Sequence, residues 1–225
     1  MIHKSILILL FISTLFLGEQ TKVLPDGFVY ADQYIKDIDV ELRYCSTYNF
    51  IGKSINGYEA NILIITEPTA RALQKVQEEL KTQGYALKVY DGYRPQRAVN
   101  HFVRWARQID DTLMKTEFYP KIDKNLLFKE GYIASKSGHS RGSTLDLTII
   151  DNKTKLAIDM GSPFDFFGQE SWINYQNITA QQRKNRLLLK TVMNKHGFRS
   201  YSKEWWHFTL RNEPFPDTYF DFPIE

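Results

Sequence analysis

The strongest constraint on how this chain can fold comes from two short motifs that carry metal-binding residue types. The first has the pattern S-x-H-x-x-G-x-x-x-D and runs from Ser137 to Asp146; the second is E-W-W-H at residues 204–207. Two histidines and an aspartate can hold a zinc ion at three corners of a tetrahedron and leave the fourth position open for water. The fold must therefore bring two segments that are distant in the sequence into one site.

The histidines of these two motifs are the natural ligands of such a site. The chain has only five histidines. His3 lies in an apolar leader, and His101 and His196 fall within helical patterns that have ordinary polar faces. His139 and His207 remain, and with Asp146 they form the predicted ligand set. Either motif alone would arise often by chance, so the pairing of the two carries the argument.

Two further side chains are candidates for the chemistry at this site. Glu204 stands three residues before His207, and its carboxylate could remove a proton from water. Arg94, in the motif D-G-Y-R-P at residues 91–95, could stabilise an oxyanion by roughly 3 kcal/mol. A structural ion pair with Asp91, or exposure at a turn, explains the arginine equally well. Together the residues indicate a metal-dependent hydrolase.

The first 18 residues predict a signal peptide. His3 and Lys4 precede an apolar run at residues 5–18, which is shorter than the roughly 20 residues that span a bilayer. An uncleaved anchor and a buried helix are the alternatives, and the usual small-residue cleavage pattern is absent. We expect export, most simply to the periplasm, a mature domain at residues 19–225, and no stable membrane insertion after the signal is removed.

Composition limits the remaining possibilities. A chain of 225 residues with 43% hydrophobic content can bury a substantial core and fits one domain. The formal net charge of +3 is too small to favour a nucleic-acid partner. Cys45 is the only cysteine, so no internal disulfide can form. The oligomeric state is not determined by these features.

Strand and helix patterns alternate along the chain. Apolar runs at residues 61–65, 86–90 and 144–150 are typical of strands. Helical spacing and cap residues predict helices from Thr66 to near Gly84, from 96 to 109, and from Thr179 to Gly197. These elements predict an α+β fold in a single domain, with a central, mainly antiparallel sheet flanked by helices and a zinc site in a cleft.

The element patterns also predict how the site residues are placed. In the strand at 144–150 the leucines and one isoleucine share a face, so Asp146 points to the other face, into a cleft. A strand also suits the aromatic run that holds His207, which puts Glu204 in the turn leading into it. A helix, in contrast, would place both on one face. The basic residues of the helix ending at Gly197 are expected on a solvated face.

The set of motifs resembles the zinc D-alanyl-D-alanine dipeptidases of the VanX type. The resemblance rests on D-G-Y-R-P, S-x-H-x-x-G-x-x-x-D and E-W-W-H, and extends through residues 39–44, 49–50, 57–59, 160–166 and 219–223. It covers nearly the whole chain after the leader. The stretch at 167–172 is less familiar than its surroundings.

The resemblance implies a role for each candidate residue. It implies one zinc ion per chain, bound by His139, Asp146 and His207, with Glu204 as general base and Arg94 as the stabiliser of the tetrahedral intermediate. It places four residues around a small dipeptide pocket: Ser137, Tyr44, Tyr58 and Asp165. A carboxylate such as Asp165 suits the free ammonium of a dipeptide. For the two tyrosines, core packing is nearly as strong an interpretation.

The predicted activity is zinc-dependent hydrolysis of the small dipeptide D-alanyl-D-alanine to two D-alanines. One alternative is a D,D-carboxypeptidase that acts on peptidoglycan stem peptides through a more open cleft. Another is a non-catalytic domain that binds peptidoglycan fragments around a structural zinc, but such sites usually have four protein ligands. Export would separate this chain from the cytoplasmic, antibiotic-resistance members of the family, which remove the dipeptide before it enters wall precursors.

Overall fold

A five-stranded sheet forms the centre of the protein, which we describe from a computed structural model for residues 23–225. The predicted signal peptide at 1–18 lies outside the described residues. In spatial order the strands are β2 (Asp39–Val40), β4 (Tyr85–Asp91), β5 (Thr144–Asp151), β7 (Glu204–Leu210) and β6 (Phe198–Tyr201). Only β2 and β4 pair in parallel; every other neighbouring pair is antiparallel. The predicted α+β fold with a mainly antiparallel sheet is confirmed.

A second, smaller sheet pairs β1 (Phe28–Tyr30) with β3 (Ile64–Thr66) in antiparallel register. The strand predicted at 61–65 therefore begins three residues later. Asn61 accepts a hydrogen bond from the Leu42 backbone at 2.7 Å through its side chain, so this residue serves the connection before the strand. Apolar character alone does not show where ladder pairing starts.

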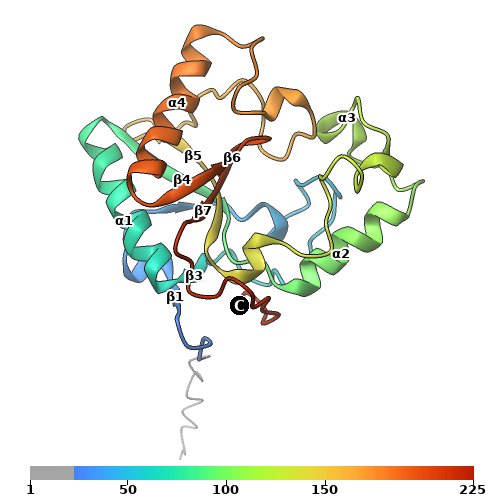
Figure 1. Ribbon diagram of the computed structural model, residues 1–225, viewed down its shortest axis with the longest axis horizontal. Helices are drawn as coiled ribbons and strands as arrows, with labels where there is room; N and C mark the ends of the chain where they lie inside the picture. The colour runs from blue at the N-terminus through green and yellow to red at the C-terminus, as the bar shows by residue number, and fades with distance from the viewer. Residues whose placement is uncertain (1–22) are drawn as a thin grey trace, which may run out of the picture.

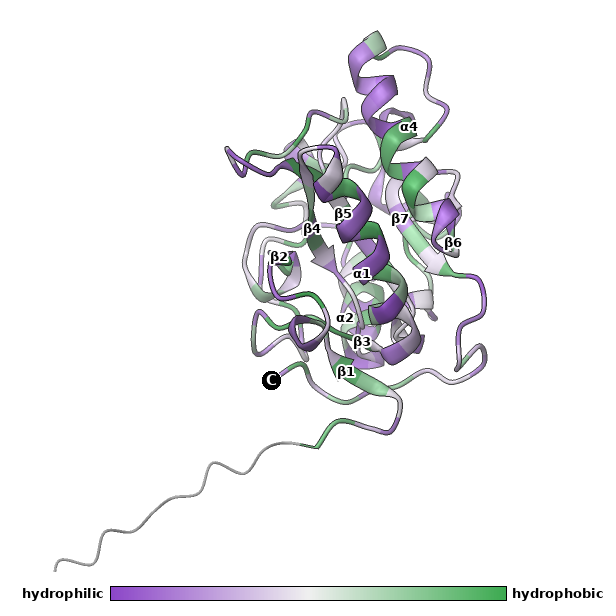
Figure 2. Cartoon of the chain, turned by 90° about the vertical axis from the view of Figure 1, so that its left-hand side faces the viewer, coloured by the Kyte–Doolittle hydropathy of each residue, from purple (hydrophilic) through white to green (hydrophobic). Residues whose placement is uncertain are grey.

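Helices lie on both sides of the central sheet (Figure 1). The α-helices are α1 (Glu67–Thr82), α2 (Gln96–Arg107), α3 (Lys115–Phe118) and α4 (Ala180–Lys195). The 3-10 helices are η1 (Ala31–Gln33), η2 (Arg43–Cys45), η3 (Lys124–Leu126), η4 (Gly138–Arg141) and η5 (Gln169–Ser171). Helix α1 packs on β4, and α4 packs on β6 and β7. In Figure 2 the view is onto α1 and α4, whose ribbons carry long hydrophilic stretches.

The helix boundaries follow local chemistry. Pro68 stands in the first turn of α1, where its missing N–H costs no hydrogen bond. Helix α4 starts with a capping box in which Thr179 accepts from the Gln182 backbone, and the Gln182 side chain accepts from the Thr179 backbone. The predicted N-cap at Thr179 is confirmed, and the helix ends two residues before Gly197.

One basic residue of α4 contradicts the predicted solvated face. Arg186 is only 3% exposed. Its guanidinium donates hydrogen bonds to three backbone oxygens, those of Met160 at 2.6 Å, Glu170 at 2.7 Å and Trp172 at 2.7 Å. Since these carbonyls flank the connection between β5 and α4, Arg186 fixes that connection against the helix.

The C-terminal strap, residues 219–224, crosses three segments that surround the site. Phe220 donates its backbone N–H to Ser140 at 2.9 Å, and its carbonyl accepts from Gln96 at 2.9 Å. The Phe222 ring stacks on Tyr93 with centroids 4.1 Å apart. Ile224 accepts from the backbone of Glu59 at 2.9 Å. The strap therefore ties together η4, the start of α2 and the loop after η2.

Among residues 23–225, no helix combines the length and the apolar character needed to cross a membrane.

Candidate metal centre and substrate cleft

Strand register places three polar side chains in one row across the sheet. Asp91 at the end of β4 is the direct partner of Asp146 on β5, and Asp146 is the direct partner of His207 on β7. Directly opposed residues on neighbouring strands project from the same face of a sheet. The row therefore brings an aspartate and a histidine from the two sequence motifs into contact, as the motifs require.

His139 reaches this row from η4. Ser137 caps the turn, because its Oγ accepts a hydrogen bond from the backbone of His139 at 3.3 Å. Gly142 closes the turn with a φ of 78°, a left-handed conformation that favours glycine. A Cβ at this position would also collide with Phe28. These local features explain why a Ser/Gly-rich sequence surrounds the histidine.

The orientation of the His139 ring leaves one nitrogen free for a metal. Its Nδ1 lies 2.8 Å from the carbonyl oxygen of Gly92, which can only accept, so Nδ1 carries the proton. Nε2 then presents a lone pair toward the carboxylate of Asp146. Metal-binding histidines are commonly oriented in this way by a hydrogen bond from the other ring nitrogen.

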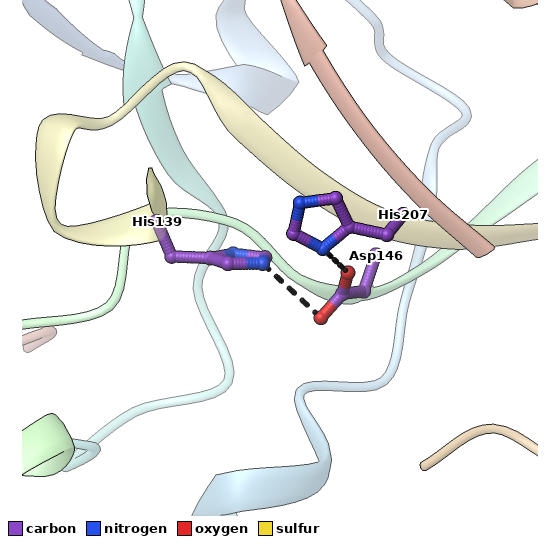
Figure 3. A group of neighbouring side chains, drawn as sticks. All are labelled: His139, Asp146 and His207. Atoms are coloured by element: carbon purple, nitrogen blue, oxygen red, sulfur yellow. Dashed lines mark ion pairs between the residues drawn. The ribbon is translucent and has the colours of Figure 1, made fainter. Parts of the chain in front are cut away.

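The three predicted ligands form a cluster that fits a metal ion. One ligand atom from each of His139, Asp146 and His207 lies within 4.8 Å of the other two. Figure 3 shows the rings of both histidines next to the Asp146 carboxylate, which they contact at 3.3 and 3.0 Å. His139 Nε2 and Asp146 Oδ1 are buried without a hydrogen-bond partner. A cation among them would satisfy these buried groups, and two imidazoles with one carboxylate suit zinc.

The charges of the cluster reinforce one another. Burial by itself would raise the pKa of Asp146, but the adjacent imidazoles of His139 and His207 hold that pKa well below its usual value. For His207, burial lowers the pKa, but contacts with Asp146 and Glu204 outweigh it and raise the pKa to about 10. In the metal-free protein His207 is therefore protonated at neutral pH.

Glu204 lies beside His207, although it belongs to β7 and not to the preceding turn as predicted. Its Oε2 is 3.3 Å from His207 Nδ1. An ideal strand would place these two residues on opposite faces. Pairing between β6 and β7 is irregular here, because the register shifts between Ser200 and Tyr201. The irregularity occurs where the strand starts and accompanies the approach of the two side chains.

Arg94 forms the structural ion pair with Asp91 that its sequence suggested, and it is not exposed at a turn. Its Nε donates to Asp91 Oδ2 at 2.8 Å, and one terminal nitrogen lies 3.4 Å from Asp146 Oδ2. The guanidinium also stacks over the rings of Tyr44 and Phe102, at 5.1 and 5.2 Å. It is thus a rigidly held structural arginine that also lines the cleft.

Tyr44 and Asp165 contact each other in the lining of the cleft. The Tyr44 hydroxyl donates to Asp165 Oδ2 at 2.8 Å, and both residues line the cleft. Burial raises the pKa of Asp165 well above its usual value, and the charge of Asp146 adds to this effect. The residue has a φ of 60°, which is uncommon outside glycine. A cation bound beside Asp165 would favour its ionised form.

Tyr58 does not line the cleft, unlike the other residues that the resemblance places there. It is buried, and its hydroxyl donates to Asp91 Oδ1 at 2.6 Å. Asp91 in turn lies 3.3 Å from His139 Nδ1 and pairs with Arg94. Sequence reasoning treated Asp91 only as an alternative partner for Arg94. Its place in the D-G-Y-R-P motif was the available signal for a larger role.

The cleft around these residues has a volume of about 240 Å³. This is below the roughly 300–1,000 Å³ of pockets for drug-sized ligands, so the cleft suits a small substrate. Its charged and polar lining residues are Tyr44, Arg94, Tyr132, Lys136, Ser137, His139, Asp146, Asp165, Tyr201, Glu204 and His207.

Comparison with known proteins identifies the family of the chain. The family profile described as D-ala-D-ala dipeptidase, of peptidase family M15, matches residues 25–225. Among similar proteins, a D-alanyl-D-alanine dipeptidase from Enterococcus faecium is 43% identical over 199 residues, which cover 88% of this chain and 98% of that protein. Proteins of the same name from Enterococcus faecalis and Streptomyces coelicolor are 42% and 41% identical, over 89% and 88% of this chain and 100% and 98% of their own. The chain therefore belongs to the D-alanyl-D-alanine dipeptidase family.

Proposed function

We propose that this protein hydrolyses D-alanyl-D-alanine to two D-alanines in a zinc-dependent reaction. The observation that carries the proposal is the cluster of His139, Asp146 and His207 in a small cleft that also holds Glu204 and Arg94. Three protein ligands leave a coordination position open, as catalytic zinc sites require. The family of the chain supports the same substrate.

Zinc, one ion per chain, would be held by the two histidines and the aspartate. When bound, it supplies a Lewis acid that polarises the scissile carbonyl and makes water more acidic. The protein provides a ligand set in which the free nitrogen of His139 is fixed by the Gly92 carbonyl.

The protein's own residues then move the protons and stabilise charge. Glu204 lines the cleft next to His207 and accepts a proton from the attacking water; it later returns a proton to the leaving amine. Arg94 is held by Asp91 and by aromatic rings, so its guanidinium can face a developing oxyanion with little reorganisation.

Asp165 is suited to the amino end of the substrate. Its carboxyl lies in the cleft and accepts a hydrogen bond from Tyr44, and a nearby cation would favour its ionised form. A dipeptide ammonium is such a cation, and the pair would be charge-assisted. Ser137 lines the same cleft and can donate a hydrogen bond.

A D,D-carboxypeptidase that trims peptidoglycan stem peptides is less well supported. Such an enzyme needs a cleft that admits a long chain beyond the scissile bond. Here the cleft is small, and Asp165 offers a carboxylate where a longer substrate would present a neutral amide.

We also propose that the enzyme is exported and acts on dipeptide outside the cytoplasm, in scavenging or wall turnover.

 The support is the charged start and the apolar run at residues 5–18, which precede the family match that begins at residue 25. Fractionation of cells that produce the full chain, with sequencing of the mature N-terminus, tests this. Intact protein that keeps residues 1–18 in the cytoplasm would contradict it.

The first prediction concerns reaction and substrate together. Zinc-loaded protein should hydrolyse D-Ala-D-Ala, and should act poorly on L-Ala-L-Ala and on a longer peptide that ends in D-Ala-D-Ala. Glu204→Gln should lower kcat by about a thousandfold with zinc content unchanged, because only the proton transfer is lost. Glu78→Gln, at an exposed position of α1, is the matched control and should behave as wild type.

Steady-state kinetics and metal analysis on the same preparations give the answer. Equal or better cleavage of the long peptide would overturn the dipeptidase assignment. Full activity of Glu204→Gln would remove this residue from the role of base.

A further inference from the structure

The proposed substrate has two charged ends, and the residues assigned so far meet only the amino end. The inference below rests on the proposed function and concerns the free carboxylate. The carboxylates that line the cleft are Asp146, Asp165 and Glu204, whereas its cationic side chains, apart from the histidines, are Arg94 and Lys136. A substrate carboxylate in this acidic cleft therefore needs one of two cations.

Arg94 is already engaged. Its guanidinium contacts Asp91 at 2.7 and 2.8 Å and Asp146 at 3.4 Å. These two carboxylates are buried, so removing the arginine from them would leave uncompensated charge in the protein interior. Arg94 is also the group placed to face the oxyanion, at the centre of the substrate and not at its end.

Lys136, in contrast, is not paired with a carboxylate of the described residues. It lies on the rim of the cleft, one residue before Ser137, and is exposed. Within residues 23–225 no carboxylate lies at ion-pair distance from its Nζ. The ammonium instead lies 4.7 Å from the ring centre of Tyr219, in the C-terminal strap. A cation–π contact of this kind restrains an ammonium without neutralising it.

Arg141, the other cation near Tyr219, differs from Lys136 because it is paired with a carboxylate. Arg141 also approaches the ring of Tyr219, at 5.7 Å. Its guanidinium, however, makes two hydrogen bonds to the carboxylate of Glu213, at 2.7 and 2.9 Å. Lys136 is therefore the cation beside the cleft that remains available to an incoming anion.

We propose that Lys136 binds the C-terminal carboxylate of the dipeptide and is a specificity-determining residue. With Asp165 at the ammonium and Lys136 at the carboxylate, the cleft matches the charge pattern of a free zwitterionic dipeptide. The carboxylate keeps its charge throughout the reaction, so the contact has the same strength in ground and transition states. Such uniform binding lowers KM and leaves kcat unchanged.

The test compares D-Ala-D-Ala with its C-terminal amide, which lacks the negative charge. Lys136→Met should raise KM for the free dipeptide by about five- to tenfold, as for an ion pair that is only partly screened from water, with kcat within about twofold. For the amide the same substitution should change KM little. Lys136→Arg should restore most of the preference, because it restores the charge.

Lys129→Met is the matched control, since Lys129 is exposed in the same connection but does not line the cleft. It should leave both substrates unaffected. Equal losses for the dipeptide and the amide in Lys136→Met would show a structural role and overturn the inference. No change for either substrate would overturn it as well.

A binding experiment separates this inference from the proposed function. Calorimetry with zinc-loaded Glu204→Gln protein, with and without Lys136→Met, measures the affinity for D-Ala-D-Ala and for the amide without turnover. The preference for the free acid should shrink by the same five- to tenfold factor. If wild-type protein does not hydrolyse D-Ala-D-Ala but prefers the free acid over the amide in a way that depends on Lys136, only the proposed reaction is rejected. If wild-type protein hydrolyses the dipeptide but Lys136→Met does not change this preference, only the role of Lys136 is rejected.

Discussion

At the scale of single residues, Asp91 links the parts of the site that the sequence presents separately. It is fully buried at the end of β4 and contacts a histidine of the candidate metal cluster, a cleft arginine and a core tyrosine. An aspartate that orients both a ligand and a cation is a supporting group of the kind that metal sites require. Its partner Tyr58 keeps its proton, because burial raises the pKa of the phenol well above its usual value.

We therefore expect Tyr58→Phe to weaken the site from outside the cleft. Loss of the hydroxyl leaves Asp91 one donor short, which should lower the free energy of unfolding by about 1–2 kcal/mol. Less restraint on Asp91 should also lower kcat, with little change in KM because Tyr58 does not line the cleft. Chemical denaturation and steady-state kinetics measure the two effects.

Tyr119→Phe provides the control. Tyr119 is also fully buried, but its hydroxyl has no hydrogen-bond partner. Removing that hydroxyl should leave stability and kinetics close to wild type. A kinetic effect of Tyr58→Phe confined to KM would instead place its hydroxyl in contact with substrate.

The sequence identified the three residues that the structure brings into one cluster, because few side-chain types bind metal ions and the chain has few histidines. It could not separate Tyr44 from Tyr58. Both are tyrosines in short motifs, and both hydroxyls donate to buried aspartates. Whether such an aspartate lies in the cleft or behind it depends on the tertiary arrangement, which residue type does not encode.

At the scale of elements, the connection between β5 and α4 is held in place by α4. Arg186 donates to three carbonyls on both sides of Asp165, the residue proposed to bind the substrate ammonium. Burial lowers the pKa of Arg186 to about 10, so it remains charged at neutral pH. The left-handed backbone at Asp165 is therefore supported by a cation bound entirely to peptide oxygens.

Arg186→Met should disturb substrate binding more than catalysis. Three carbonyls would lose a charged donor, which should lower the free energy of unfolding by at least about 3 kcal/mol. Movement of the connection should raise KM for D-Ala-D-Ala more than it lowers kcat, and zinc content should stay at one per chain. Lys184→Met, at an exposed position of the same helix, should be near neutral.

If Arg186→Met lost zinc as readily as affinity for substrate, the hydrogen bonds of Arg186 would support the whole site and not only the part that binds the substrate ammonium. Calorimetry, metal analysis and kinetics on both variants distinguish these outcomes.

Helix and strand positions were largely predictable, since caps and periodicity are local. The buried face of α4 also carried a local signal that the prediction missed. Arg186 stands three residues before Leu189 and seven before Met193, which is the spacing of a buried stripe, and both are fully buried. A charged side chain predicts exposure, but a guanidinium can be buried when backbone carbonyls accept its hydrogen bonds.

At the scale of the whole molecule, the site depends on strand register. Asp91, Asp146 and His207 meet because β4, β5 and β7 pair so that these residues are opposed. A shift of one residue would turn a strand's side chains to the opposite face. Register is fixed by contacts between distant segments, so the sequence could suggest that the motifs converge but not how.

Removal of the metal should affect this whole arrangement and should depend on pH. The ion would join η4, β5 and β7, so zinc-free protein should unfold at a lower temperature. The pKa of His207 is about 10 without metal, because Asp146 and Glu204 outweigh the effect of burial. Below that pH, zinc must displace a proton, so its affinity should rise as the pH increases toward 10.

Calorimetric titration of zinc at pH 7.5, in buffers with different enthalpies of ionisation, should detect about one proton released. In the zinc-free protein, the raised pKa of His207 contributes stability that is complete below about pH 6.5 and is lost as the pH rises through 10. Binding without proton release would show that His207 is already neutral.

The C-terminal strap has a consequence for biosynthesis. Its residues leave the ribosome after every side chain of the metal centre, yet they hold η4 next to His139 and the loop next to Arg94. A nascent chain that ends before the strap contains His139, Asp146 and His207. It lacks the strap's hydrogen bond to η4 and its ring contact with Tyr93, the residue before Arg94. We therefore expect the strap to support metal binding, so that a chain cut after residue 218 should bind zinc more weakly than the full chain.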